Sequence, residues 1–151
     1  MMRIFTELHI SKAKEEAENS LMTNPKIKFS FDRKWSHNFL PQAGVYAIFD
    51  KGKLCYIGQT ANLRERMKEV KRTYNHSFRK KIGYTLGGII KERKFSESIE
   101  EELNEYFENN LSFSSIAIEF GRLEIESYLI QKYKDLLNSK QKRKSQLIIS
   151  Y

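Results

Sequence analysis

The feature that most constrains the fold is the stretch YAIFDKGKLCYIGQT, residues 46–60. Two β-prone runs flank an Asp-Lys-Gly sequence, and glycine readily adopts the positive φ that a short turn needs. The stretch therefore predicts an antiparallel hairpin over residues 44–58. An ordinary core strand would carry Leu or Val where this hairpin carries Tyr46 and Tyr56, so the two phenols need an explanation.

The length of the loop decides whether these tyrosines meet. A three-residue loop with Gly52 in the left-handed conformation places Tyr46 opposite Tyr56, on one face of the sheet. A two-residue loop would shift the register by one and separate them. We expect the longer loop, because Gly52 stands where positive φ is required. A tyrosine pair that only packs is the structural alternative.

The remaining hydrophobic patterns predict an α+β fold. We expect helices over residues 6–22, 62–73 and 121–137, and an acidic helix over 96–108 capped by Ser96 or Ser98. Asn62 and Glu65 form a capping-box pattern at the start of the second helix. Alternating residues predict strands near 27–31 and 112–118. The basic segment after residue 75 is expected to be helical and interrupted at Gly87 and Gly88.

The net charge of +8 is distributed unevenly along the chain. Residues 62–94 hold 11 Lys and Arg against 3 Glu, residues 95–110 hold 6 Glu and no base, and the tail 139–151 is basic. A positive patch attracts a polyanion over about 8 Å at physiological salt. A solvated basic surface is the alternative. The predicted nucleic-acid contacts are Arg64, Lys68, Lys71, Arg72, Arg79, Lys80 and Lys81.

The composition argues against several classes of protein. No run of about 18 apolar residues predicts a membrane span, and the N-terminal residues do not resemble a secretory signal. Cys55 is the single cysteine, so no disulfide framework is expected. We therefore expect a cytoplasmic protein with no membrane partner. Its predicted organisation is an N-terminal extension over 1–41, one domain over 42–138 and a basic tail over 139–151.

Glu126 falls within the apolar arc of the predicted helix 121–137. An ionised carboxylate on an inward face costs several kcal/mol unless it is paired or binds a cation. An ion pair with a neighbouring arginine is the structural alternative. Arg66 lies at the edge of the core stripe of the helix that follows the hairpin. Two phenols, a guanidinium and an inward carboxylate could therefore converge, and such a set is suited to attack on a phosphodiester.

These residues carry a resemblance to a known family. The pattern comprises Gly44-Val45-Tyr46, Tyr56-Ile57-Gly58, Arg66 eight residues later, Glu126 within IESYLI, and Asn138 twelve residues beyond it. Over residues 42–138 it resembles the GIY-YIG nucleases. The resemblance implies a three-stranded antiparallel sheet flanked by helices, with strands near 44–49, 54–58 and 112–118.

The resemblance also implies roles for the site residues. Glu126 would bind one Mg²⁺ or Mn²⁺ ion, and Arg66 would hold the phosphate oxygens. Tyr46 would be the general base toward the attacking water, with Tyr56 positioning water or phosphate. Asn138 is counted among the site residues, and capping of a helix is its alternative role.

One position departs from the family pattern. Many members carry His or Tyr four residues after the arginine, where this chain has Val70. Tyr74 or His76 could substitute from the next turn. His76 is therefore included among the predicted catalytic residues, with a surface position as its alternative.

The sequence thus predicts a metal-dependent DNA endonuclease that uses a single cation, acting on duplex DNA. Two alternatives remain: a catalytically weak nucleic-acid-binding module of GIY-YIG type, and an interaction domain that uses the acidic helix 96–108. The DNA target, the biological role and the oligomeric state are left open, and a dimer on DNA is one arrangement that the sequence allows.

Overall fold

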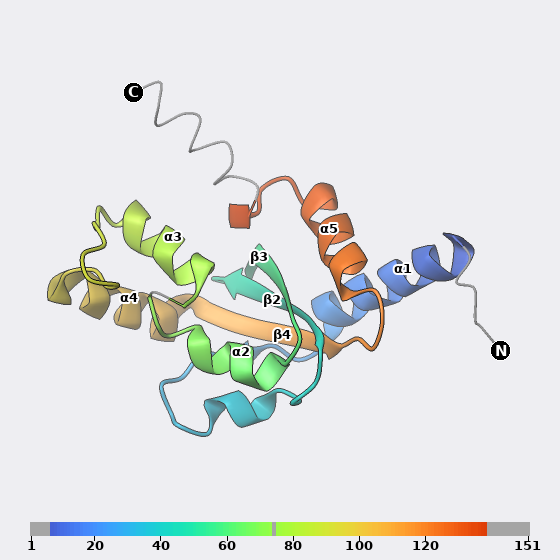
Figure 1. The fold of residues 1–151 in the computed structure, drawn as a ribbon, viewed down its shortest axis with the longest axis horizontal. Coiled ribbons are helices and arrows are strands. Elements are labelled where there is room, and N and C mark those ends of the chain that lie inside the picture. Colours follow the sequence, from blue (N-terminus) through green and yellow to red (C-terminus); the bar gives the residue numbers. More distant parts are fainter. Residues whose placement is uncertain (1–6, 74, 139–151) are drawn as a thin grey trace.

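The computed structural model describes residues 7–73 and 75–138, and it has the predicted α+β class, with one antiparallel sheet flanked by helices (Figure 1). The tail predicted over 139–151, and Tyr74 as a substitute for the residue at Val70, lie outside the described residues.

The sheet has four strands rather than the three predicted. They are β1 (Ile27–Lys28), β2 (Gly44–Asp50), β3 (Lys53–Thr60) and β4 (Leu111–Ala117), in the spatial order β1-β4-β2-β3. Every neighbouring pair is antiparallel. The fourth strand, β1, lies within the strand predicted from the alternation near 27–31, but it is only two residues long and pairs with β4 at the edge of the sheet opposite β3.

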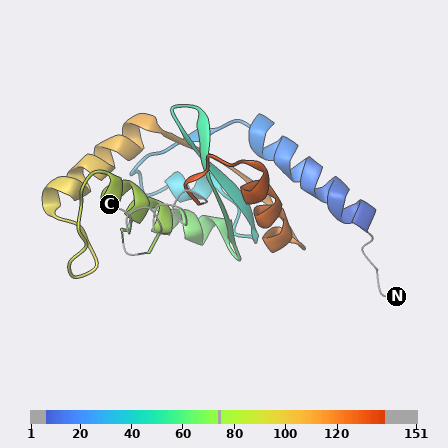
Figure 2. The ribbon, with the colours of Figure 1, turned by 90° about the horizontal axis from the view of Figure 1, so that it is seen from above.

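Helices cover both faces of the sheet (Figures 1 and 2). The face that carries Tyr46 and Ile48 packs into a core to which α2 (Leu63–Glu69), α3 (Ser77–Thr85), α4 (Glu97–Asn110) and the short 3₁₀ helix η1 (Trp35–Asn38) contribute. The other face carries Val45 and Ala47 and packs against α1 (Glu7–Thr23) and α5 (Arg122–Lys132). Because β2 is central and buried on both faces, its sequence is an almost continuous apolar run.

The predicted helix starts are confirmed more often than the predicted ends. The Asn62 side chain accepts a hydrogen bond from the backbone N–H of Glu65 at 3.1 Å, and Ser96, rather than Ser98, caps α4. Helix α2 ends at Glu69 instead of residue 73. A turn follows it, in which the Arg72 N–H donates to the Glu69 carbonyl. Helix α5 ends at Lys132 instead of residue 137, because the next residue is extended.

The hairpin loop has two residues, so the prediction of a three-residue loop is wrong. Asp50 pairs directly with Lys53, and Lys51 and Gly52 have φ of 52° and 83°. Two left-handed residues define the type I′ turn, whose twist matches that of the flanking strands. The sequence-based expectation allowed positive φ at Gly52 alone, which led to the wrong loop.

A β-bulge compensates for the shorter loop. Ile48 pairs with Tyr56 whereas Phe49 pairs with Leu54, so Cys55 is an extra residue in β3. One inserted residue reverses the alternation of faces. Tyr46 and Tyr56 therefore lie on the same face, as predicted. Their predicted direct pairing is wrong, because Gly58 stands opposite Tyr46.

Helix α1 is joined to α5 by polar contacts as well as by apolar packing. The carboxylate of Glu18 accepts hydrogen bonds from the phenols of Tyr128 (3.0 Å) and Tyr133 and forms an ion pair with Lys132 (2.8 Å). Burial raises the pKa of Glu18, but these partners outweigh it, so the pKa lies below its ordinary value. The two helices lie side by side in both views (Figures 1 and 2).

No helix within the described part of the chain combines the length and the apolar character that crossing a membrane requires.

The type I′ turn generates a stability prediction. Lys51 holds a left-handed conformation that is unfavourable for a long side chain and well tolerated by asparagine. Lys51→Asn is therefore expected to raise the free energy of unfolding by about 0.5–1 kcal/mol in urea titrations. Gly52→Ala is the control and should lower it. Equal or lower stability of Lys51→Asn would contradict the assigned turn.

Candidate active site

Two buried tyrosines form the centre of the site. Tyr46 on β2 is 1% exposed and Tyr56 on β3 is 7% exposed, and their ring centroids are 6.4 Å apart. Phe78 from α3 packs edge-on against Tyr56. Both rings are thus buried in the core on one face of the sheet.

Two glycines make this packing possible. A Cβ atom on Gly58 would lie 2.2 Å from Cζ and 2.3 Å from Oη of Tyr46, so the phenol rests directly on the backbone of β3. A Cβ atom on Gly44 would lie 2.2 Å from the carbonyl oxygen of Ile116 on β4. The two outer residues of the paired triplets are therefore sites of close backbone approach.

His76 contacts the hydroxyl of Tyr46 directly. Its Nε2 lies 2.8 Å from Tyr46 Oη, and its Nδ1 accepts the backbone N–H of Phe78 as the N-cap of α3. Because Nδ1 is an acceptor, a neutral ring carries its proton on Nε2 and donates it to Tyr46. The side chain is completely buried, which excludes the alternative of a surface position.

Burial and nearby cations keep this imidazole neutral. Burial lowers the pKa of His76 to about 3, with further lowering by Arg66 and Lys81. Val70, at the position where the family pattern has His or Tyr, is wholly buried at the end of α2. The structure places His76, a predicted substitute for the residue at this position, against Tyr46.

The same environment governs the two phenols. Burial strongly raises the pKa of Tyr46, and the neighbouring Tyr56 raises it further, while the Arg66 guanidinium lowers it. Burial also raises the pKa of Tyr56, against the lowering effects of Arg66 and of a hydrogen bond with Ser77. Glu126 raises both values. The charges of Arg66 and Glu126 therefore act in opposite directions on the pKa values of the same two phenols.

Arg66 is held at the end of α2. Its Nη1 donates to the carbonyl of Asn75 at 3.0 Å and lies 3.7 Å from the carboxylate of Glu69. The side chain is 24% exposed. One edge of the guanidinium is thus fixed by the protein, and part of the group remains accessible to solvent.

Glu126 projects from α5 toward the free edge of β3. Burial raises the pKa of its carboxyl, and a hydrogen bond from the backbone N–H of Gln59 partly offsets this. Among the described residues no Lys, Arg or His forms an ion pair with Glu126, which argues against the predicted alternative of a structural ion pair. A half-buried carboxylate with a raised pKa and no cationic partner suits a hard cation.

Asn138 contacts the same edge strand, β3, at Ile57. Its Oδ1 accepts the N–H of Ile57 at 3.1 Å and its Nδ2 donates to the Ile57 carbonyl at 2.7 Å. This side chain therefore pairs with β3 as a neighbouring strand would. The early end of α5 at Lys132 allows the chain to return to the edge at this point.

The site offers few metal ligands. Within residues 7–73 and 75–138, no group of three or more His, Cys, Asp or Glu side chains is arranged to hold a metal ion. Glu126 is the predicted ligand, and water and substrate oxygens would complete the coordination of a cation such as Mg²⁺. This donor set fits a single hard cation held by one carboxylate.

The predicted nucleic-acid contacts occupy different environments. Lys68 and Arg72 are exposed, whereas Arg64, Lys71 and Lys80 are partly buried. Lys68 pairs with Glu65 at 2.9 Å, and Arg64 Nε donates to the carbonyl of Phe39 at 3.0 Å.

Arg79 does not fit the prediction that it contacts DNA. Its side chain is buried, with an ion pair to Glu100 at 2.9 Å and hydrogen bonds to Thr73 and Asn104. It also lies over the ring of Phe107. Arg79 thus joins α3 to α4, the acidic helix that carries its partner Glu100.

Lys81 lies closer to the tyrosines than the sequence suggested. Its Nζ is 5.4 Å from the ring centroid of Tyr56 and 3.5 Å from the carbonyl of Leu137. Burial lowers its pKa. The sequence gives no clear signal of this position, because Lys81 is five residues after His76 and a helix brings together residues that are three or four apart.

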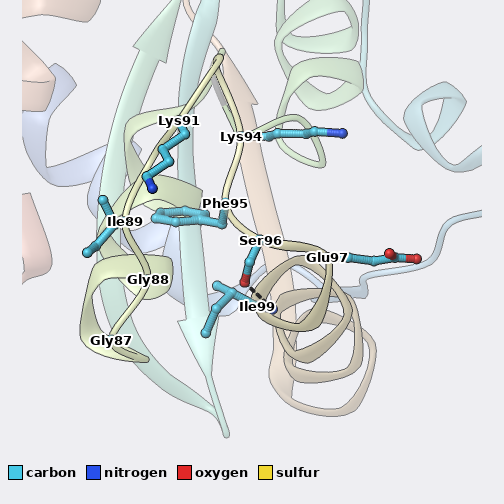
Figure 3. Close-up of a pocket in the computed structure, with 9 residues that line it drawn as sticks. All are labelled: Gly87, Gly88, Ile89, Lys91, Lys94, Phe95, Ser96, Glu97 and Ile99. Carbon is cyan, nitrogen blue, oxygen red and sulfur yellow. Dashed lines mark hydrogen bonds between the residues drawn. The ribbon is translucent and has the colours of Figure 1, made fainter.

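A separate hollow of about 470 Å³ opens between the turn after α3 and the start of α4 (Figure 3). It is lined by Gly87, Gly88, Ile89, Lys91, Lys94, Phe95, Ser96, Glu97 and Ile99. None of the predicted catalytic residues belongs to this lining.

Comparisons with known proteins agree with the sequence pattern. A family model described as the GIY-YIG catalytic domain matches residues 34–148. Among solved structures, the GIY-YIG N-terminal endonuclease domain of UvrC from Thermotoga maritima, described as bound to its catalytic divalent cation, is similar. It is 18% identical, with 70% of this chain and 93% of that chain covered and a TM-score of 0.39. The comparison with curated proteins gave no match.

The buried neutral His76 generates a prediction about acid stability. Its pKa is about 3 when folded and about 6.5 when unfolded, so between these values only the unfolded chain is protonated at this residue. The free energy of unfolding should therefore fall as the pH drops below 6.5. We expect His76 to contribute a loss of about 2 kcal/mol between pH 7 and pH 5 in urea titrations.

His76→Asn is the matched variant, because asparagine can also cap α3. Its overall stability will be lower, but its dependence on pH over the same interval should be flatter by this amount. An unchanged slope would show that His76 does not stay neutral in the folded protein.

Proposed function

The chain belongs to the GIY-YIG catalytic domain family, a family of nuclease domains, and we propose that it is a divalent-metal-dependent DNA endonuclease. The observation that carries the proposal is a pair of buried phenols on one face of the sheet, whose pKa values respond to both Arg66 and Glu126. Among the described residues Glu126 has no ion-pair partner.

Glu126 is the proposed metal ligand. A divalent cation held there would polarise the scissile phosphate and stabilise the departing 3′-oxygen. The carboxylate oxygens suit Mg²⁺ or Mn²⁺. The N–H of Gln59 orients the carboxylate at the sheet edge.

Arg66 is the proposed phosphate clamp. Its contact with the Asn75 carbonyl fixes the guanidinium and leaves other N–H groups for the non-bridging oxygens, where charge gathers in the transition state. Lys81, whose Nζ lies 5.4 Å from the centroid of the Tyr56 ring, would add a second positive charge near that tyrosine. Tyr56 would position the water or the phosphate between these groups.

Tyr46 is the proposed general base, and His76 is its partner. Since the neutral imidazole donates from Nε2, it supports the phenolate form of Tyr46 and leaves the lone pairs of Oη to accept a proton from water. Arg66 favours the same ionised form, whereas burial opposes it. The base is therefore scarce at neutral pH, and its amount increases as the pH rises.

Asn138 is proposed as a positioning residue. It closes the free edge of β3 next to Tyr56 through two hydrogen bonds with Ile57. Contacts with duplex DNA would come from the exposed basic side chains Lys68 and Arg72, with the partly buried Arg64, Lys71 and Lys80 near them.

A catalytically weak nucleic-acid-binding module is the second candidate. The near-complete burial of Tyr46 and the apolar Val70 favour it, because both reduce the chemistry available to water at the site. Supercoiled plasmid incubated with the protein and Mg²⁺ or Mn²⁺ separates the two candidates. The module would bind duplex DNA with a steep salt dependence and leave the plasmid intact.

Removing the proposed metal ligand should abolish cleavage. Glu126→Gln is expected to reduce nicking of supercoiled plasmid by at least about 100-fold, because the neutral amide binds a divalent cation poorly. Glu124→Gln, an exposed residue on the same helix, is the matched control and should retain activity. Chelation by EDTA should have the effect of Glu126→Gln. Equal cleavage by the Glu126→Gln variant and the wild type would refute the proposed metal site.

Removing the proposed base should change both the rate and its pH dependence. Tyr46→Phe keeps the ring on Gly58 and is expected to lower the single-turnover cleavage rate by about 10²–10⁴-fold. For the wild type, the raised pKa of Tyr46 predicts a rate that increases with pH through the neutral range. A rate that is independent of pH while chemistry is limiting would contradict the role of Tyr46.

A further inference from the structure

Arg122 and Glu126 present a pair of opposite charges that does not form an ion pair. They are four residues apart on α5, a spacing that places two side chains on one face of a helix within reach of each other. No ion pair between them is present among the described residues. An arginine in the first turn is also unfavourable for the helix dipole, so helix stability does not account for it.

Gln59 on β3 contacts both members of this pair. Its side-chain Oε1 accepts a hydrogen bond from Arg122 Nε at 2.9 Å. Its backbone N–H donates to the carboxylate of Glu126. One residue therefore holds the arginine with its side chain and the glutamate with its main chain, and Figure 1 shows α5 running past the edge strand that supplies it.

This arrangement has a consequence for cation binding. If the guanidinium of Arg122 were paired with Glu126, a divalent cation would have to displace it before binding. Because Arg122 donates its hydrogen bond to the side-chain amide of Gln59, it does not compete with a cation for Glu126. The carboxylate of Glu126 then remains available to the cation, because among the described residues no ion pair occupies it.

We propose that Gln59 is a positioning residue that holds Arg122 away from Glu126 and so keeps the carboxylate open for a divalent cation. This inference rests on the proposed function in taking Glu126 as the metal ligand. It adds a role for Gln59 and Arg122, two residues that are not among the predicted catalytic residues.

The test measures Mn²⁺ affinity by isothermal titration calorimetry on the full chain, without DNA. Gln59→Ala removes the acceptor while leaving the backbone N–H in place, and it should weaken Mn²⁺ binding by about three- to tenfold as Arg122 turns to Glu126. The double variant Gln59→Ala/Arg122→Gln should return the affinity to the wild-type value. Gln131→Ala, on the exposed side of α5, is the matched control and should not change it.

A structure of the metal-free Gln59→Ala variant provides a second readout. It should place the Arg122 guanidinium within ion-pair distance of Glu126. Unchanged Mn²⁺ affinity in Gln59→Ala, or an equally weak double variant, would overturn the inference. If the wild type bound no Mn²⁺ although the Gln59→Ala structure showed the new ion pair, the positioning role would stand and the metal site would fail. Absence of both effects would overturn the inference itself.

Discussion

The contact of the Tyr46 ring with Gly58 is the constraint on which the rest of the site depends. No side chain can stand at residue 58, because its Cβ would overlap the phenol. The ring therefore lies flat over β3 and directs its hydroxyl toward the edge strand, where His76 meets it. His76 in turn begins α3, so the position of one phenol is tied to the start of a helix. Alternation along the strands supplies Tyr56 on the same face.

The free edge of β3 is the second organising element. An edge strand leaves alternate backbone groups without a strand partner, and these groups need another partner when they are buried. Here Asn138 satisfies Ile57, and Glu126 accepts from Gln59. The chain thus uses the unpaired edge to orient the polar side chains of the site. Asn138 and Glu126 are thus both predicted site residues and partners of backbone groups at the free edge of β3.

The sequence predicted the helix starts better than the positions of the site residues in three dimensions. The helix caps at Asn62 and Ser96 depend on local chemistry, and both are confirmed. Tyr46 and Tyr56 were predicted to share a face, and they do, although the loop length behind that prediction is wrong. The bulge at Cys55 shifts the register by one residue and so offsets the shorter loop. The sequence carries no clear signal of this bulge. Arg79 was misassigned because charge alone does not reveal a buried partner such as Glu100. The contact between Gln59 and Arg122 joins residues far apart in the chain, and no periodicity links them.

The cluster around Glu18 has a bearing on where the folded unit begins. Glu18 lies before residue 34, where the match to the family model starts, yet it holds Tyr128 and Lys132 of α5 and Tyr133 directly after it. Ala17 and Leu21 of α1 belong to the same apolar cluster as Ile125 and Leu129 of α5. A fragment limited to the matched residues would lack α1. It would expose the apolar side of α5, the helix that carries Glu126, to solvent. The match to the family model therefore starts after α1, a helix that packs against the sheet and α5 as part of the same fold.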